Sequence, residues 1–208
     1  MEIPVTEKKI KQRISSYRSA LKKEIETYGI ISDGYGKRYL LFSLYFVLND
    51  LEKSAEYFEW FEEEFPADVG EPGMYLSWAV SLHRMGKDRD ARIKLAMLLL
   101  SNIYFIPQLL GDIDIKKEDM WHSSNYEEID YFDYMPDDIF KEISSSEKEW
   151  IKTVYQSDDF QKMKKTHIDI YGELLHEKNV EKRKALVDMS SVQWLHLYGM
   201  PIDVVKND

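Results

Sequence analysis

The 208-residue chain contains no cysteine, which excludes disulfide bonds, thiolate metal sites and cysteine nucleophiles. Glycine and proline are also scarce, at nine and six residues. Their scarcity disfavours turn-rich β architectures and suits long helices. Hydrophobic residues nevertheless make up 44% of the chain and aromatic residues 13%. Such a content is too high for a disordered chain, so we expect a helical protein with a substantial core.

Long hydrophobic runs are absent as well. The longest apolar run, Tyr39 to Leu48, is interrupted only by Ser43 and is much shorter than the ~20 residues that span a bilayer. The first nine residues lack the apolar core of a signal peptide. We therefore expect a cytoplasmic location and no interaction with a membrane, and the lack of cysteine is compatible with a reducing compartment.

The charge is predominantly negative, with a formal net charge of −10. A surface of this sign repels a phosphate backbone on average, so we do not expect nucleic acid as a partner. The charge is distributed unevenly. Residues 6–28 contain seven Lys and Arg against three Glu, whereas residues 112–138 are mostly acidic. A solvated helix face and an acidic loop account for these two segments, and a docking surface is the alternative.

The spacing of apolar residues predicts helices along most of the chain. Between Thr6, a suitable N-cap, and Gly29, a suitable stop, the apolar residues form one stripe: Ile10, Ile14, Tyr17, Leu21, Ile25 and Tyr28. Helical hairpins are predicted over residues 37–48 with 51–65 and over residues 73–85 with 88–100. An irregular acidic segment, residues 104–143, follows, with short helices near 106–110 and 126–134. Residues 144–199 predict three helices, at 146–155, 158–176 and 180–198, and we expect one all-α domain over residues 1–208.

The two hairpins form a degenerate repeat, because their turn residues Asn49 and Gly86 lie 37 residues apart. The first copy contains Leu41, Tyr45, Asn49, Ser54, Phe58 and Pro66, and the second contains Trp78, Ala79, Leu82, Gly86, Ala91 and Leu95. This pattern resembles the tetratricopeptide repeat (TPR) over about residues 35–103. Phe42 and Phe61 stand where that family has small residues, and its period is ~34. The resemblance implies stacked antiparallel hairpins with a concave groove, capped by the C-terminal helices.

On the register of the repeat, the groove would be lined mainly by apolar residues: Tyr39, Ser43, Phe46, Leu76, Val80 and His83, with Arg84 at its edge. Family members that bind chaperone tails clamp a carboxylate with Lys and Asn, where this chain has Tyr39 and Ser43, so chaperone-tail binding is not expected. An open groove predicts that Tyr39, Phe46, Leu76 and Val80 are partly exposed. A groove filled by the N-terminal or C-terminal helix predicts that they are buried.

The helix predicted over residues 51–65 has more aromatic residues than one helix face can hold. Phe58, Phe61 and Phe65 fit the core, whereas Tyr57 and Trp60 point to other sides. We expect Tyr57 and Trp60 to contact a neighbouring helix, such as the N-terminal one, or a partner.

The five histidines form no recognisable catalytic or metal-binding pattern. Glu173 and His176 have the Glu-x-x-His spacing of di-iron bundles, but a second copy is missing. His122 follows several acidic residues that lack the order of an EF-hand. The loop Gly34 to Arg38 is faintly like a phosphate-binding turn before a helix, although no strand precedes it. We therefore expect no catalytic residue, no metal and no cofactor.

These observations predict a protein-protein interaction module that binds a protein or peptide through the TPR-like groove or another surface. One alternative is an acidic immunity or inhibitor protein that neutralises a basic partner by charge complementarity. A second alternative is an enzyme with a cleft between the repeats and the C-terminal helices, using Glu173, His176 or His122 as an acid-base group. The oligomeric state is left open.

Overall fold

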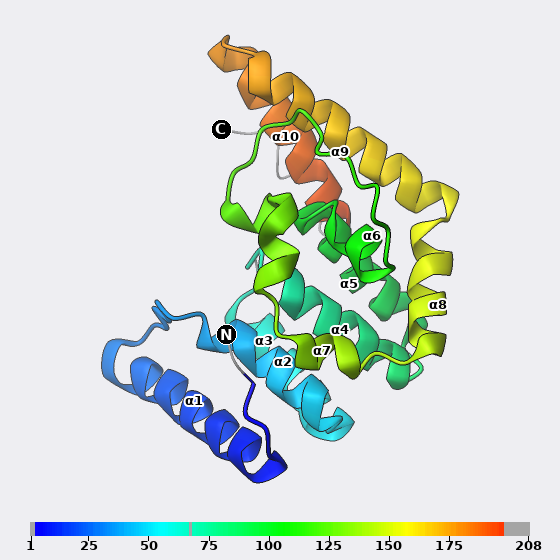
Figure 1. Cartoon of the computed structure of the whole chain (residues 1–208). Coiled ribbons are helices and arrows are strands. Elements are labelled where there is room, and N and C mark those ends of the chain that lie inside the picture. Colours follow the sequence, from blue (N-terminus) through cyan, green and yellow to red (C-terminus); the bar gives the residue numbers. More distant parts are fainter. Residues whose placement is uncertain (1–2, 67, 198–208) are drawn as a thin grey trace. The chain divides into compact units, whose positions relative to one another are not determined.

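The computed structural model describes residues 3–66 and 68–197, and within these ranges it contains helices and no strands (Figure 1). The predicted all-α fold class is confirmed. Two compact units make up the chain: residues 1–94 with 134–144, and residues 95–133 with 145–208. Helix α5 (Asp88–Ser101) begins in the first unit and continues in the second. That the whole chain forms one domain stays a prediction, and each unit is described by itself.

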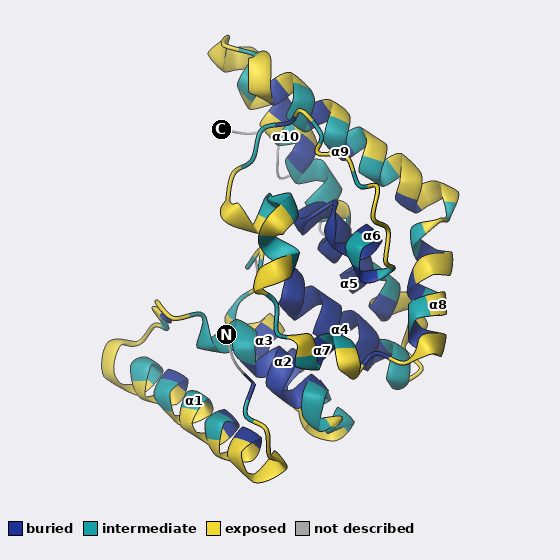
Figure 2. Ribbon diagram, viewed as in Figure 1, coloured by how far each residue is buried: buried dark blue, intermediate teal, exposed yellow. Residues whose placement is uncertain are grey.

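In the first unit, α1 (Glu7–Tyr28) has the ends and the inner face that its sequence predicts. The Thr6 hydroxyl accepts a hydrogen bond from the backbone N–H of Lys9 at 3.4 Å, and Gly29 ends the helix with a φ of 71°. Ile10, Ile14 and Leu21 are buried on one face, while the other faces are mostly exposed (Figure 2). Tyr17 and Ile25 of the predicted stripe are half-buried. Tyr28 is 74% exposed, so the prediction is wrong for this last residue of the helix. α1 packs on α2 (Lys37–Leu48) through this face.

α2 is the central helix of the first unit, because it packs against α1, α3 (Leu51–Glu64) and α4 (Pro72–Arg84). Asn49 makes the predicted tight turn between α2 and α3 in the left-handed conformation, with a φ of 51°. Phe42 lies at the centre of an aromatic core. Its ring centroid is 4.8 Å from Trp78, 5.1 Å from Tyr57 and 5.2 Å from Phe58. The Phe42 side chain of α2 therefore contacts aromatic rings of both α3 and α4.

A short helix that the sequence did not predict, α7 (Asp137–Lys141), also belongs to the first unit and packs on α2. Just before it, Met135 lies so close to Gly73 in α4 that a Cβ on Gly73 would be 2.3 Å from the Met135 Cε. Five residues are too few to show a helical period, so this helix could not be recognised within the irregular segment.

The second unit is built around a helical hairpin of α9 (Asp158–His176) and α10 (Val180–Leu197). α8 (Ser145–Tyr155) packs on α9, and α6 (Phe105–Leu109) lies in the chain that follows α5. Two apolar clusters join these parts: Ile103, Tyr104 and Met120, and Ile170, Leu174 and Leu186. The predicted C-terminal helices are confirmed within the described residues, and residue 198 of the last one lies outside them.

The acidic segment of the second unit has a fixed path. The Asn102 side-chain amide donates to the backbone carbonyls of Tyr126 at 2.7 Å and Glu128 at 3.0 Å. The Gln108 amide donates to the Ile129 carbonyl at 2.9 Å. The segment forms the 3-10 helices η1 (Asn125–Glu127) and η2 (Ile129–Tyr134), close to the helix expected near residues 126–134. Among the described residues, no helix combines the length and hydropathy needed to cross a bilayer.

Candidate functional site

The residues expected to line an open groove are mostly buried. Phe46 is 1% exposed, Leu76 and Val80 are 0% exposed, and Ser43 is 4% exposed with its hydroxyl 3.3 Å from that of Ser77. The prediction of partial exposure is therefore wrong for Phe46, Leu76 and Val80. A physical reason is visible at Phe46, whose ring lies 4.6 Å from the Arg84 guanidinium. Neighbouring parts of the fold fill the space that an open groove would leave.

Tyr39, His83 and Arg84 are half-buried and already have partners inside the first unit. The Tyr39 hydroxyl donates to Asp68 at 2.5 Å, and its burial raises the pKa of this phenol above its ordinary range. His83 Nδ1 lies 2.9 Å from Asp88 Oδ1. Arg84 donates to the Asn49 side chain at 2.9 Å and to the Glu142 carbonyl at 2.6 Å. These residues tie α2, α4 and the end of α7 together, so they are not assembled into an open binding surface.

The loop before α2 is closed by a carboxylate of the chain itself. The buried Asp33 side chain accepts hydrogen bonds from the backbone N–H groups of Lys37 at 2.9 Å and Arg38 at 2.8 Å. The Arg38 guanidinium lies 3.4 Å from the same carboxylate. These are the donors at a helix N-terminus that a phosphate would use. Asp33 occupies their position, so the loop is a capped helix start.

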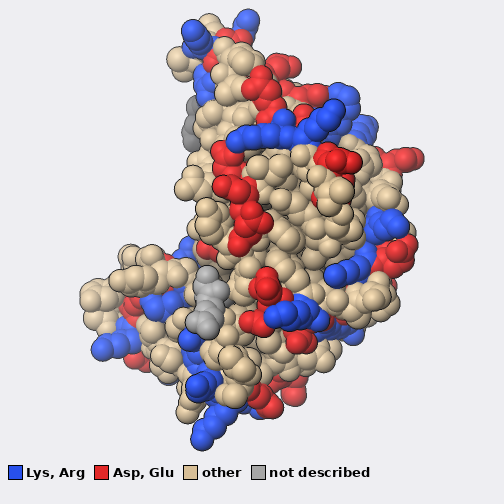
Figure 3. All heavy atoms as spheres, in the orientation of Figure 1, with Lys and Arg blue, Asp and Glu red and all other residues tan. Residues whose placement is uncertain are grey.

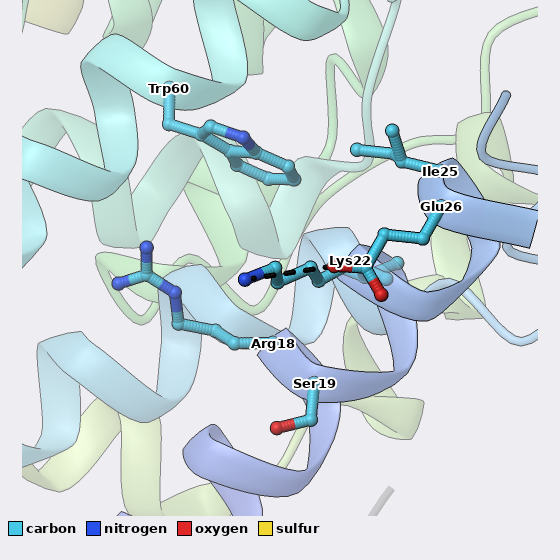
Figure 4. A pocket seen from close by; sticks show the side chains of 7 residues that line it. Arg18, Ser19, Lys22, Ile25, Glu26 and Trp60 are labelled. Atoms are coloured by element: carbon cyan, nitrogen blue, oxygen red, sulfur yellow. Dashed lines mark ion pairs between the residues drawn. The ribbon is translucent and has the colours of Figure 1, made fainter. Parts of the chain in front are cut away.

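A pocket of about 340 Å³ lies between α1 and α3 in the first unit. Six of its lining residues come from α1, namely Arg18, Ser19, Leu21, Lys22, Ile25 and Glu26, and Trp60 comes from α3. Figure 4 shows the Trp60 indole on the α3 side, across the pocket from Ile25 and Lys22. The volume is at the small end of the range for ligand pockets, about 300–1,000 Å³.

The pocket has an apolar floor and a basic rim. Leu21 is buried and Ile25 and Trp60 are half-buried, so three apolar side chains meet there. At the rim, the Lys22 ammonium lies 3.7 Å from the Glu26 carboxylate, and both side chains are largely exposed. The Arg18 guanidinium donates to the Tyr45 hydroxyl at 3.2 Å. Lys and Arg side chains continue along α1 beyond the pocket (Figure 3).

Tyr57 and Trp60 differ in their burial and in the helices that they contact. Tyr57 is fully buried among the aromatic residues of the core, its hydroxyl donates to the Arg38 carbonyl at 2.7 Å, and burial raises its pKa. The Trp60 ring is tilted by 30° against that of Tyr57, with a centroid distance of 5.3 Å, and Trp60 reaches the pocket beside α1. The contact with the N-terminal helix was therefore predictable for Trp60, whereas the pocket depends on the spacing of α1 and α3.

The residues considered for acid-base chemistry do not form one site. Glu173 and His176 are exposed on α9, and His176 Nε2 lies 3.5 Å from Asp119 Oδ2. His122 is half-buried, with Nδ1 3.8 Å from Glu127 Oε2. His167 of α9 is buried. Across residues 3–66 and 68–197, no group of three or more His, Asp and Glu side chains has the arrangement of a metal site.

The chain was compared with models of protein families, with curated proteins and with solved structures, and none of these comparisons found a match.

Proposed function

We propose that this protein is a protein-interaction module that docks a partner in the pocket between α1 and α3. The observation that carries the proposal is the combination, in one concave site, of Trp60, two aliphatic side chains and the cationic groups of Arg18 and Lys22. Tryptophan and arginine are the residue types most enriched where protein interfaces gain their binding free energy. Because the residues of the predicted groove are mostly buried, we place the partner at the α1–α3 pocket instead.

The chemistry of the pocket defines the partner segment. Its floor accepts a large apolar side chain, because burial of such a group against Leu21, Ile25 and Trp60 is favourable. Its rim and the rest of α1 favour acidic residues beside that anchor. We therefore propose a partner segment with a leucine or aromatic anchor flanked by Asp or Glu.

The TPR-like interpretation is part of this proposal. α2 packs against both α3 and α4, which are the neighbour relations of two stacked hairpins. The family resemblance then favours a scaffold for protein binding. The enzyme alternative receives no comparable support within the described residues, because Glu173 and His176 are exposed while the ring nitrogens of His122 are buried.

Peptide binding tests the proposal directly. Fluorescent 15-residue peptides with a central leucine or phenylalanine flanked by acidic residues are titrated with the full chain, and anisotropy is measured. Trp60→Ala is expected to weaken binding about 30-fold, since loss of an interface anchor costs about 2 kcal/mol or more. Lys22→Glu is expected to weaken it by reversing a charge at the rim.

Lys23→Glu is the matched control, because Lys23 is the next residue of α1, is exposed and does not line the pocket. It is expected to bind more tightly than Lys22→Glu. Peptides with basic flanks are expected not to bind. Equal binding of acidic and basic peptides, or equal effects of the two charge reversals, would contradict the proposal.

The fixed path of the acidic segment favours a second function, the inhibitor that neutralises a basic partner. Residues 112–133 carry eight Asp and Glu against two Lys. Acidic side chains cover the stretch that passes through η1 and η2 (Figure 3). Because Asn102 and Gln108 hold this backbone in place, the carboxylates are preorganised for a cationic surface.

Charge reversal in that segment separates the two functions. The double variant Asp130→Lys with Asp133→Lys is expected to lose capture of a basic partner from native lysate, and raised salt is expected to have the same effect. Glu181→Lys, at an exposed position of α10, is the control. If the amount of captured partner is the same at raised salt and in the double variant, the inhibitor function is ruled out.

A further inference from the structure

The chain between Asp112 and Glu128, here called the strap, is held against α9 in the second unit (Figure 1). The backbone N–H of Trp121 donates to the Tyr171 carbonyl at 2.9 Å. The rings of Trp121 and Tyr171 are stacked with a centroid distance of 6.1 Å. Met120 of the strap is buried, and Tyr171 packs against its cluster. The strap therefore closes over an apolar surface of α9.

Two imidazoles lie within this junction. His122 belongs to the strap, and His167 belongs to α9, where it is 2% exposed and stacks on Tyr171 at a centroid distance of 4.2 Å. Both ring nitrogens of His122 and Nδ1 of His167 are buried and have no hydrogen-bond partner within the described parts of the chain. Buried polar atoms without partners are uncommon in native structures, and each one calls for an explanation such as stored strain or a functional role.

The charged neighbours can compensate one proton at this junction. Glu127 of the strap lies 3.8 Å from His122, and its carboxylate also accepts a hydrogen bond from the backbone N–H of Ser123 at 3.0 Å. A proton on His167 would place a positive charge on a buried ring. The other ionisable groups around the junction are Glu128 of the strap, Tyr104 before α6, Tyr171 of α9, and Arg183 of α10, which is 5.9 Å from the Trp121 ring. At its exposed edge, His176 of α9 lies 3.5 Å from Asp119 of the strap.

We propose that His167, which lies beneath the strap beside Tyr171, is an acid-triggered latch that keeps the strap on α9 while its ring is neutral and releases the strap when the ring is protonated. Release hydrates the imidazolium group. It also frees the acidic groups of the strap and exposes Trp121 and Tyr171. The strap overlaps the acidic segment, residues 112–133, but the latch requires no partner bound to that segment.

The direction of the pH dependence follows from burial. Burial, with a smaller contribution from His122, lowers the pKa of His167 from 6.5 to about 4. When the strap is released, the His167 ring is hydrated and binds a proton more readily, so acid favours release. The closed state is fully favoured above pH 6.5 and is lost as the pH falls toward 4. By this linkage, the equilibrium constant for release rises about 30-fold between pH 7.5 and pH 5.

Hydrogen-deuterium exchange of the full chain at pH 7.5 and pH 5, corrected for intrinsic exchange rates, tests the latch. Peptides from the strap are expected to lose protection by at least about tenfold at pH 5, while peptides from α2 and α4 keep theirs. Unchanged protection of the strap would overturn the proposal. So would a parallel loss of protection in α2 and α4, because acid would then unfold the chain globally.

Variants assign the effect to the His167 ring. His167→Phe keeps an aromatic ring on Tyr171 but cannot take up a proton, so its strap is expected to stay protected at pH 5. His167→Leu, a second replacement that cannot take up a proton, makes the same test if His167→Phe does not fold. His196→Gln, at an exposed position of α10, is the control and is expected to behave as the wild type. A wild-type response in either folded His167 variant would overturn the latch.

Discussion

At the scale of single residues, Asp33 is a buried charge with a complete set of partners. Its two carboxylate oxygens accept from the backbone N–H groups of Lys37 and Arg38, and its own N–H donates to Glu24 at 3.0 Å. Arg38 links it further to Asp68 at 2.9 Å. One side chain thus starts α2 and fixes the loop that leads to it. This explains why a glycine-rich loop next to two cations is not an anion site.

Asp33→Ala is expected to reduce the free energy of unfolding by about 1–3 kcal/mol, because it leaves two buried N–H groups and part of the Arg38 charge without a partner. Asp33→Asn, which keeps one acceptor oxygen, is expected to cost less. Urea unfolding followed by circular dichroism measures both. Asp112→Ala at an exposed position is the control and is expected to stay within about 0.5 kcal/mol of the wild type. A similar small effect at Asp33 would show that water replaces its hydrogen bonds.

Residue-level prediction from the sequence succeeded where one helix face decides burial. Ile10, Ile14 and Leu21 are buried as their spacing requires, whereas Tyr28 of the same stripe is exposed. The predicted contact of Tyr57 with a neighbouring helix is confirmed, and that helix is α2, which contributes Phe42 and Tyr45. A single-helix period cannot identify the neighbour, because tertiary packing decides it. The pocket at Trp60 was hidden for the same reason: it depends on how far α1 stands from α3, and only tertiary packing sets that distance.

At the scale of elements, helix positions were largely predictable and short or irregular elements were not. The ends of α2 follow from Gly36 and Asn49, both in the left-handed conformation. The amide side chains of Asn102 and Gln108, in contrast, fix an irregular segment more than 20 residues further along the chain. Such long-range contacts leave no period in the sequence, so the route of the acidic segment could not be predicted.

The start of α5 offers a test of helix packing. Ala79 and Ala91 are both 0% exposed, at the positions where the repeat register has small residues. Ala91→Leu adds volume to this packed position and is expected to lower the free energy of unfolding by about 1–3 kcal/mol. Thermal and urea unfolding measure the change. Ala185→Leu, at an exposed position of α10, is the matched control and is expected to be nearly neutral. Equal effects at both positions would mean that α5 does not depend on a small residue here.

At the scale of the whole molecule, the all-α class follows from composition and period, but the division into units does not. Residues 134–144 return to the first unit, where α7 packs on α2, almost a hundred positions earlier in the sequence. No local pattern encodes such a return. A linear description of the chain therefore assigned residues 104–143 to a single irregular segment, although they contribute to both units.

The N-terminal helix provides the last prediction, which concerns the integrity of the first unit. Ile10, Ile14 and Leu21 are between 1% and 8% exposed, and Arg18 donates to the hydroxyl of the buried Tyr45. Deleting residues 1–28 removes these side chains and uncovers the face of α2 on which they pack. The burial of three aliphatic side chains contributes roughly 5–9 kcal/mol, which is comparable to the whole stability of a typical domain, about 5–15 kcal/mol.

The truncated chain is therefore expected to lose protection in α2 and α4 by hydrogen exchange and to aggregate, and to lose any partner held at the α1–α3 pocket. The triple variant Lys8→Ser, Lys9→Ser, Lys23→Ser controls for the loss of charge, because these residues are exposed on α1 and lie away from its buried stripe. It is expected to fold as the wild type does. A truncated chain that remains soluble, with α2 and α4 protected, would show instead that α1 is an accessory helix and that the core of the first unit is complete without it.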